Sequence, residues 1–291
     1  MLLRILAIIF PVFAIVAVGF FYARRHRPDM AFANQLNMHV FVPALVFAAL
    51  ASRDFDLTAY WPLAAGGVLV VLGSGLLTWP LASLLKVDKR TFLPPMMFNN
   101  SGNMGLPLML LAFGEQALPA AVVLFFVENV LHYSLGTWML DHHARLWNLW
   151  RVPVIAASLG GLAVSLLKIE LWSPLYISIK MLGDVSIPLL LFSLGVRLTS
   201  SGIKDIRLGM IGAAACPLAG MALAWVCAPL LGLQGTQAGM LLIFGALPPA
   251  VLNYIFAELY RQEPEKVASI VMVGNVAALI FVPLALAIAL P

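Results

Sequence analysis

Charged residues are scarce in this 291-residue chain, which has 13 Asp and Glu and 17 Lys and Arg, together 10% of the sequence. A soluble domain carries roughly a quarter charged residues to keep its surface hydrated. Apolar residues instead make up 62% of the chain. The composition excludes an ordinary globular protein and predicts an all-α membrane protein that crosses the bilayer many times.

Cysteine is nearly absent as well, with only Cys216 and Cys227, eleven residues apart in one apolar segment. That spacing fits neither a metal site nor a disulfide framework. The sequence also has no P-loop, and no serine, histidine and carboxylate set or paired metal motif at matching depth. We therefore expect no cofactor, no metal, no nucleic-acid partner and no enzymatic activity.

Long apolar runs are abundant and predict ten spans, five in residues 1–140 and five in residues 152–291, joined by a loop at 141–151. The first five lie near 2–22, 31–51, 60–85, 91–113 and 118–140. The second five lie near 152–168, 174–197, 206–231, 236–259 and 267–290.

The cations divide unevenly between the loops that this count defines. Loops after odd-numbered spans hold thirteen: Arg24, Arg25, Arg27, Lys86, Lys89, Arg90, Arg145, Arg151, Arg197, Lys204, Arg207, Arg261 and Lys266. The other side holds four: Arg4, Arg53, Lys168 and Lys180. Since cytoplasmic loops are enriched in Lys and Arg, both termini are expected outside the cytoplasm.

The two series of spans resemble each other at an offset of about 145 residues. Pro43 aligns with Pro188, and Asn129 aligns with Asn275 one residue out of that register. Matches among apolar residues also arise by chance. Because each series has an odd number of spans, a true repeat would be inverted, an architecture found mainly in transporters.

Two corresponding spans contain residues that disfavour a continuous helix. Span 4 contains Asn99–Pro107, with three Asn, and span 9 contains Gly245–Asn253, with two adjacent prolines. Paired interruptions indicate a transport site at the bilayer midplane, although kinks or close helix packing also use Gly and Pro. The expected breaking residues are Gly102, Gly105, Pro107, Pro248 and Pro249.

A broken helix exposes a half-helix N-terminus with unpaired N–H groups and a partial positive charge. Neither interruption contains Asp or Glu. Two crossed broken helices would therefore suit a carboxylate or another small anion, although the opposing C-terminal ends would suit a cation. The residues expected to bind the substrate are Asn99, Asn100, Ser101, Asn103, Asn129, Asn253 and Asn275.

Three further ionisable residues within the spans are candidates for proton coupling. Glu128 and His132 are four residues apart and share one face of span 5. They would couple transport to a proton, or form a static pair that joins helices. Asp184 in span 7 is a third candidate, but Lys180, four residues before it, favours a structural ion pair.

The sequence resembles the auxin efflux carrier family in three features. They are the run Asn-Ser-Gly-Asn-Met-Gly-Leu-Pro-Leu at Asn100–Leu108, the pair Pro248 and Pro249, and ten spans in two inverted fives. That family includes plant auxin exporters and bacterial carboxylate carriers. The resemblance implies a fold similar to bile-acid and sodium/proton antiporters, with substrate bound beside crossed broken spans 4 and 9. Spans 1, 2, 6 and 7 would form a scaffold, and spans 3–5 and 8–10 a mobile transport domain.

The short loop at 141–151 resembles the bacterial members, which implies the inner (plasma) membrane and argues against auxin as the substrate. Our leading hypothesis is a secondary transporter of a small organic anion working by alternating access. A membrane sensor that keeps the fold, and an intramembrane enzyme, are the alternatives. A proton or sodium ion as the coupling ion, and a homodimer through the scaffold helices, are left open.

Overall fold

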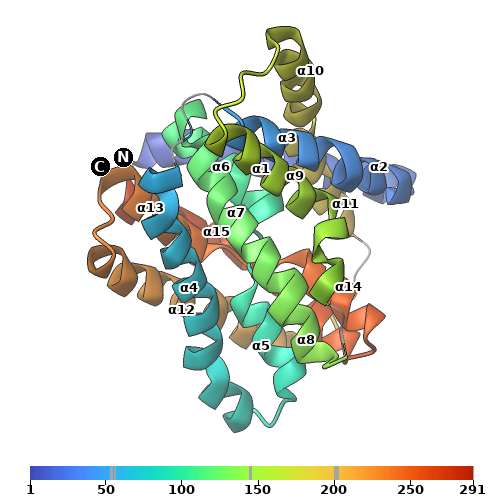
Figure 1. Cartoon of the computed structure of the whole chain (residues 1–291). Helices are drawn as coiled ribbons and strands as arrows, with labels where there is room; N and C mark the ends of the chain where they lie inside the picture. The colour runs from blue at the N-terminus through green and yellow to red at the C-terminus, as the bar shows by residue number, and fades with distance from the viewer. Residues whose placement is uncertain (53–54, 56, 144–145, 200–202, 291) are drawn as a thin grey trace.

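The structure, a computed structural model, describes residues 1–290 except 53–54, 56, 144–145 and 200–202. Arg53 and Arg145, two of the loop cations discussed above, therefore lie outside the described residues. Within the described part, the chain is helical and contains no β-strand (Figure 1).

The first half contains α1 (Leu2–His26), α2 (Ala31–Leu36), α3 (Val42–Leu50), α4 (Leu57–Leu84), α5 (Lys89–Met97), α6 (Leu106–Phe113), α7 (Leu118–Leu131) and α8 (Thr137–Leu140). The second half contains α9 (Pro153–Leu166), α10 (Ser173–Asp184), α11 (Ser186–Arg197), α12 (Ile206–Leu230), α13 (Gly235–Ala246), α14 (Val251–Leu259) and α15 (Pro264–Ala289). Short π-helical turns connect some of them: η1 (Asn37–Phe41), η2 (Ser101–Gly105) and η4 (His132–Gly136). Two 3₁₀ turns, η3 (Glu115–Ala117) and η5 (Leu146–Arg151), complete the order.

Among the described residues, seven helical segments are long and apolar enough to cross a membrane. They are Leu2–His26, Ala31–Leu50, Thr58–Leu84, Glu115–Leu140, Ser173–Arg197, Ile206–Leu230 and Pro264–Ala289. Three apolar helices are shorter, Ser101–Phe113, Pro153–Leu166 and Gly235–Ala246. Helix length alone therefore does not show ten spans. Two of the short helices, Ser101–Phe113 and Gly235–Ala246, are parts of longer segments that are interrupted.

Two of the helices begin at an aspartate whose carboxylate caps the first turn. Asp88 accepts a hydrogen bond from the backbone N–H of Arg90 at 2.8 Å, before α5. Asp205 accepts one from the N–H of Leu208 at 2.9 Å, before α12. A capping carboxylate satisfies a donor that has no partner within the helix, and it also interacts favourably with the helix dipole.

The contacts between the described helices divide them into two groups. In the α1/α11 group, α1 packs on α11, and α3 packs on α9 and α10. In the α12 group, α12 packs on α4, α13 and α15, and α4 packs on α5 and α7. Contacts of α1 with α6 and of α3 with α7 join the two groups.

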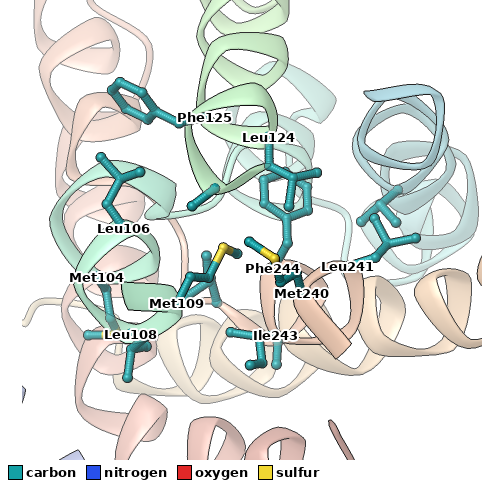
Figure 2. Packing of buried hydrophobic residues seen from close by; sticks show 14 of the residues in the cluster. Met104, Leu106, Leu108, Met109, Leu124, Phe125, Met240, Leu241, Ile243 and Phe244 are labelled. Atoms are coloured by element: carbon teal, nitrogen blue, oxygen red, sulfur yellow. The ribbon is translucent and has the colours of Figure 1, made fainter. Parts of the chain in front are cut away.

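Apolar side chains fill the interior of the α12 group where α6, α7 and α13 meet (Figure 2). Met109, Leu124, Met240 and Phe244 are at most 1% exposed. Other large apolar side chains cover the outside, where residues such as Leu230 on α12 are largely exposed. An outer surface of this kind is suited to lipid rather than to water.

The backbones of α12 and α13 meet at Gly220 and Gly245. A Cβ atom on Gly245 would lie 2.3 Å from the carbonyl oxygen of Gly220, and one on Gly220 would lie 2.2 Å from that of Gly245. Small residues permit such close approach between helices in a membrane. This contact lies one residue before the end of α13 at Ala246.

We expect Gly245→Ala to destabilise the protein. Alanine favours a helix by up to about 1 kcal/mol, but overpacking against backbone costs about 1–3 kcal/mol, so the clash outweighs the gain. Thermal unfolding in detergent should show a lower Tm than for Gly160→Ala, whose Cβ would lie 3.5 Å from the Phe47 ring. An equal Tm for the two variants would contradict this packing.

Candidate functional site

Two helical segments are interrupted within the α12 group. α5 ends at Met97, and helical structure resumes at Ser101. α13 ends at Ala246, and α14 begins at Val251. The second interruption falls within the run Gly245–Asn253, and the first, at residues 98–100, overlaps the start of the run Asn99–Pro107.

The two interrupted segments cross and pair with each other. Asn99 and Pro249 lie opposite one another in an antiparallel bridge. The backbone N–H of Asn100 donates to the carbonyl of Pro248 at 2.7 Å, and that of Ala250 donates to the carbonyl of Phe98 at 3.0 Å. Each break thus satisfies backbone groups that the other break leaves without a helical partner, as a membrane interior requires.

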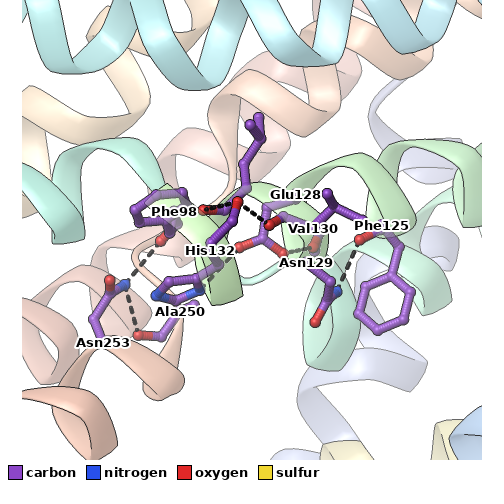
Figure 3. Close-up of polar contacts among 11 residues, drawn as sticks. Phe98, Phe125, Glu128, Asn129, Val130, His132, Ala250 and Asn253 are labelled. Atoms are coloured by element: carbon purple, nitrogen blue, oxygen red, sulfur yellow. Dashed lines mark hydrogen bonds and ion pairs between the residues drawn. The ribbon is translucent and has the colours of Figure 1, made fainter. Parts of the chain in front are cut away.

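Asn99 and Asn253 reinforce this crossing with their side-chain amides. Asn99 Nδ2 donates to the carbonyl of Phe244 at 2.6 Å, at the end of α13. Asn253 Nδ2 donates to the carbonyl of Phe98 at 2.9 Å and to that of Ala250 at 3.0 Å (Figure 3). Their donors are therefore used within the protein, while the Oδ1 atoms of both residues are buried without a partner among the described residues.

Asn100 and Asn275 form a second brace. Asn100 Nδ2 donates to Asn275 Oδ1 at 2.9 Å. Asn275 Nδ2 donates in turn to the carbonyl of Pro249 at 3.1 Å and to that of Val271 at 2.8 Å. Both Asn side chains are buried, so this brace ties α15 to the crossing.

The residues expected to break the helices occupy two different positions. Pro248 and Pro249 lie inside the second interruption. Gly102 and Gly105 lie just after the first, in η2, and Pro107 lies in the first turn of α6. The extended part of the first break is therefore shorter than the run from Asn99 to Pro107.

A cavity of about 150 Å³ lies beside the crossing, between the two helix groups. The starts of both half-helices line it, through Gly102 and Asn103 on one side and Ala250, Val251 and Leu252 on the other. The α1/α11 group contributes Asn34, Asn37, Met38, Val42, Leu190, Ser193 and Arg197. The remaining walls are Asn99, Asn100, Phe125, Glu128, Asn129, His132 and Ile255.

Several polar groups at this cavity have no protein partner among the described residues. The backbone N–H groups of Gly102, Asn103 and Leu252 belong to first helical turns and make no hydrogen bond there. The side-chain amide of Asn103 likewise makes none. On the opposite wall, Ser193 Oγ is buried without a partner. Donors from both groups are therefore available to a bound molecule.

Glu128 and His132 form a buried pair next to the crossing (Figure 3). Glu128 Oε2 accepts a hydrogen bond from Ser101 Oγ at 2.7 Å, and Glu128 Oε1 lies 3.3 Å from His132 Nδ1. The His132 ring stacks on Phe98, with centroids 4.1 Å apart and planes at 6°. Glu128 therefore contacts one end of the first interruption, at Ser101, and His132 contacts the other end, at Phe98.

The other two polar residues singled out from the sequence differ in their position. Asn129 lines the cavity, and its Nδ2 donates to the carbonyl of Phe125 one turn earlier at 2.8 Å. Asp184 does not line the cavity and instead pairs with Lys180 at 3.2 Å, with both side chains about half exposed. Asp184 therefore has no contact with the crossing among the described residues.

Sequence reasoning missed four polar residues of the cavity wall: Asn34, Asn37, Ser193 and Arg197. The two Asn residues lie within a predicted span, which was a signal that could have been used. Arg197 was counted only as a loop cation, yet it is partly buried as the last residue of α11. The sequence places it at the end of a span but does not show which way the side chain points.

Within the described residues, no three His, Cys, Asp or Glu side chains come together as ligands for a metal ion. Cys216 and Cys227 are both buried free thiols.

The two kinds of Asn at the crossing should respond differently to mutation. Asn275→Ala removes a brace and leaves the carbonyl of Pro249 without its side-chain donor, so we expect a loss of about 1–3 kcal/mol in unfolding free energy. Asn103→Ala removes a side chain without a protein partner and should change stability by about 0.5 kcal/mol or less. Thermal unfolding in detergent without ligand measures both. A Tm for Asn103→Ala as low as that of Asn275→Ala would contradict the assignment.

The sequence of this chain is similar to those of known transporters. A family model described as membrane transport protein matches residues 4–146 and 142–286. An uncharacterised transporter of Methanocaldococcus jannaschii is 22% identical over 65% of this chain and 64% of its own length. A candidate malonate transporter of Rhizobium meliloti is 26% identical over 70% of this chain and 69% of its own.

A plant protein extends this similarity. Auxin efflux carrier component 6 of Arabidopsis thaliana is 27% identical over 58% of this chain, which spans only 28% of the plant protein. The family match covers nearly all of the chain, and the relatives are transporters rather than enzymes. The chain therefore belongs to the membrane transport protein family, that of the auxin efflux carriers.

Proposed function

We propose that this protein is a secondary transporter that moves a small organic anion, a carboxylate, across the membrane by alternating access. The substrate would bind in the cavity beside the crossing. The observation that carries the proposal is that the first turns of both half-helices, at Gly102 and Asn103 and at Val251 and Leu252, line one cavity.

The electrostatics of these two half-helices favour an anion. Each helix N-terminus carries roughly half a positive charge, and its first N–H groups point outward as donors. The amide of Asn103 adds a donor beside them. Backbone N–H groups and a positive helix end form a binding site for a carboxylate without requiring a charged side chain.

The helix packing supports a division into a scaffold and a transport domain. The α1/α11 group would form the scaffold and the α12 group would carry the substrate, since the cavity lies between them. The two breaks pair with each other in the same way, because Asn100 donates to Pro248 and Ala250 donates to Phe98. An inverted repeat with two-fold symmetry would produce this local arrangement. On this reading the interrupted segments and α9 complete ten spans.

Orientation and substrate class rest on other observations. The excess of Lys and Arg in the loops after odd-numbered spans supports a bacterial inner membrane location with both termini outside the cytoplasm. The candidate malonate transporter among the relatives supports a carboxylate as the substrate.

We expect Asn103→Ala to weaken substrate binding. Loss of an amide that hydrogen-bonds a charged ligand costs about 1.5–3 kcal/mol, or roughly ten- to a hundredfold in affinity. Uptake of labelled malonate into proteoliposomes and ligand-induced shifts in Tm measure the effect. Gln116→Ala is a matched control, because it removes an exposed amide that does not line the cavity. Wild-type affinity and flux in a folded Asn103→Ala variant would show that the site is elsewhere.

We expect Glu128→Gln to uncouple transport from a proton gradient. Glutamine keeps an oxygen that can accept from Ser101 Oγ but cannot gain and lose a proton at neutral pH. An imposed pH gradient should drive malonate accumulation with wild-type protein but not with Glu128→Gln, while exchange of labelled for unlabelled malonate continues in both.

Two results would contradict this assignment of the proton. Gradient-driven accumulation that survives in Glu128→Gln would exclude this carboxylate as the coupling group. Absence of any gradient effect with wild-type protein would exclude proton coupling, and Glu128 would then serve only to hold Ser101 and His132 in place.

A further inference from the structure

Two buried oxygen atoms on the α1/α11 wall of the cavity have no hydrogen-bond partner among the described residues. They are Oδ1 of Asn37, a residue that is 2% exposed, and Oγ of Ser193, a residue that is 5% exposed. η1, which begins at Asn37, contacts α11, which contains Ser193. A buried polar atom without a partner is costly, so each of these two atoms requires an explanation.

Hydroxyl groups elsewhere in this protein are satisfied within their own helical segment. Thr78, Thr137 and Ser158 each donate to the carbonyl four residues earlier, at 2.6, 2.7 and 2.8 Å. Ser193 lies in the second half of α11, but its hydroxyl makes no such bond among the described residues. The donor and the acceptor of this hydroxyl therefore remain for a bound molecule.

Asn37 begins a π-helical turn, in which the backbone N–H of Val42 donates to the carbonyl of Asn37 five residues earlier. Single π-helical turns within α-helices are rare and occur frequently at functional sites. This turn lies inside the apolar segment Ala31–Leu50, and Asn34, Asn37 and Met38 all line the cavity. The irregular backbone of the segment therefore coincides with the part that faces the cavity.

The wall that contains Ser193 lies close to the half-helix that begins with η2. α11 contacts η2, and Gly102 and Asn103 of η2 line the same cavity as Ser193. The cavity has a volume of about 150 Å³, which suits a small acid. An acid whose carboxylate lies at the half-helix start would therefore place its other groups beside the α1/α11 wall.

The two oxygen atoms together match a hydroxyl group. The Ser193 hydroxyl both donates and accepts, whereas Asn37 Oδ1 only accepts. A ligand hydroxyl can donate to Asn37 Oδ1 and accept from Ser193 Oγ, so that both atoms gain a partner. A carboxylate only accepts, and it would leave Asn37 Oδ1 unpaired beside a negative charge.

An ammonium group fits this wall less well than a hydroxyl. It needs a compensating negative charge when it is buried. The described residues that the α1/α11 group contributes to the cavity include no Asp or Glu, and they include a cation, Arg197. Glu128 belongs to the α12 group, where it accepts from Ser101 and pairs with His132.

We propose that Asn37 and Ser193 bind a hydroxyl group of the substrate, so that the protein favours hydroxycarboxylates over the same acids without the hydroxyl. This inference rests on the proposed function, since it takes the carboxylate to lie at the half-helix starts. The similarity to a candidate malonate transporter does not imply it, because malonate carries no hydroxyl.

The test uses purified full-length protein and acids that share one carbon skeleton. Propionate, lactate and alanine carry hydrogen, hydroxyl and ammonium at the second carbon, and malonate and hydroxymalonate form a second pair. Shifts in Tm, and calorimetry, measure the affinities. Wild-type protein should bind hydroxymalonate about tenfold more tightly than malonate, and lactate about tenfold more tightly than propionate, because each hydroxyl makes two neutral hydrogen bonds.

Variants assign this preference to the two residues. Ser193→Ala and Asn37→Ala should each weaken hydroxymalonate binding roughly two- to tenfold and change malonate binding less than about twofold. The two losses should not add in the double variant, because both residues bind one hydroxyl.

Ser186→Ala is the matched control. Ser186 Oγ is also buried on α11 without a partner among the described residues, but Ser186 does not line the cavity. Without ligand, Ser186→Ala and Ser193→Ala should both keep or raise the Tm, since each removes a buried hydroxyl that has no partner. Only Ser193→Ala should change the preference for hydroxymalonate.

Four results would overturn the inference alone. They are equal affinities of wild-type protein for malonate and hydroxymalonate, tighter binding of alanine than of lactate, an unchanged preference in both single variants, and an equal loss for both acids in Ser193→Ala. Failure of wild-type protein to bind any of these acids would overturn the proposed function as well, and would be recognised before any variant is compared.

Discussion

Two helices break inside the membrane, and each break is satisfied by the other. An isolated break would leave backbone N–H and C=O groups without partners in a medium that supplies none. Here Asn100 donates to Pro248 and Ala250 donates to Phe98, so each break is stable only because the other is present. The prolines provide acceptors and remove donors that would otherwise need partners.

This pairing separates groups that hold the crossing from groups that face the cavity. Side-chain donors of Asn99, Asn253 and Asn275 are used in bracing, whereas Asn103 and the first N–H groups of both half-helices have no protein partner among the described residues. Glu128 joins the two sets, because it accepts from Ser101 at the start of η2 and also lines the cavity. A change in the charge of Glu128 would therefore act directly on the half-helix that faces the substrate.

The sequence predicted the breaks because Asn, Gly and Pro at the middle of apolar runs have few other uses in a lipid-facing helix. It also located Glu128 and His132 through their spacing. The sequence did not distinguish Asn275, whose amide braces the crossing, from Asn103, whose amide has no protein partner among the described residues. That difference depends on which carbonyl lies opposite each amide. Arg197 was missed because a cation at the end of a span has the same sequence signature whether it faces cytoplasm or cavity. The π-helical turns that hold Asn37, Asn103 and His132 leave no periodic signal at all.

A substrate that occupies the cavity between the two half-helix starts should protect a cysteine placed there from chemical labelling. A cysteine would replace Leu252, which lines the cavity, with Cys216 and Cys227 replaced by alanine. Gln116→Cys in the exposed turn η3 is the control. Malonate at concentrations that saturate transport should slow maleimide labelling at position 252 in proportion to occupancy, and leave labelling at position 116 unchanged. Equal labelling rates at position 252 with and without saturating malonate would show that malonate does not occupy this cavity.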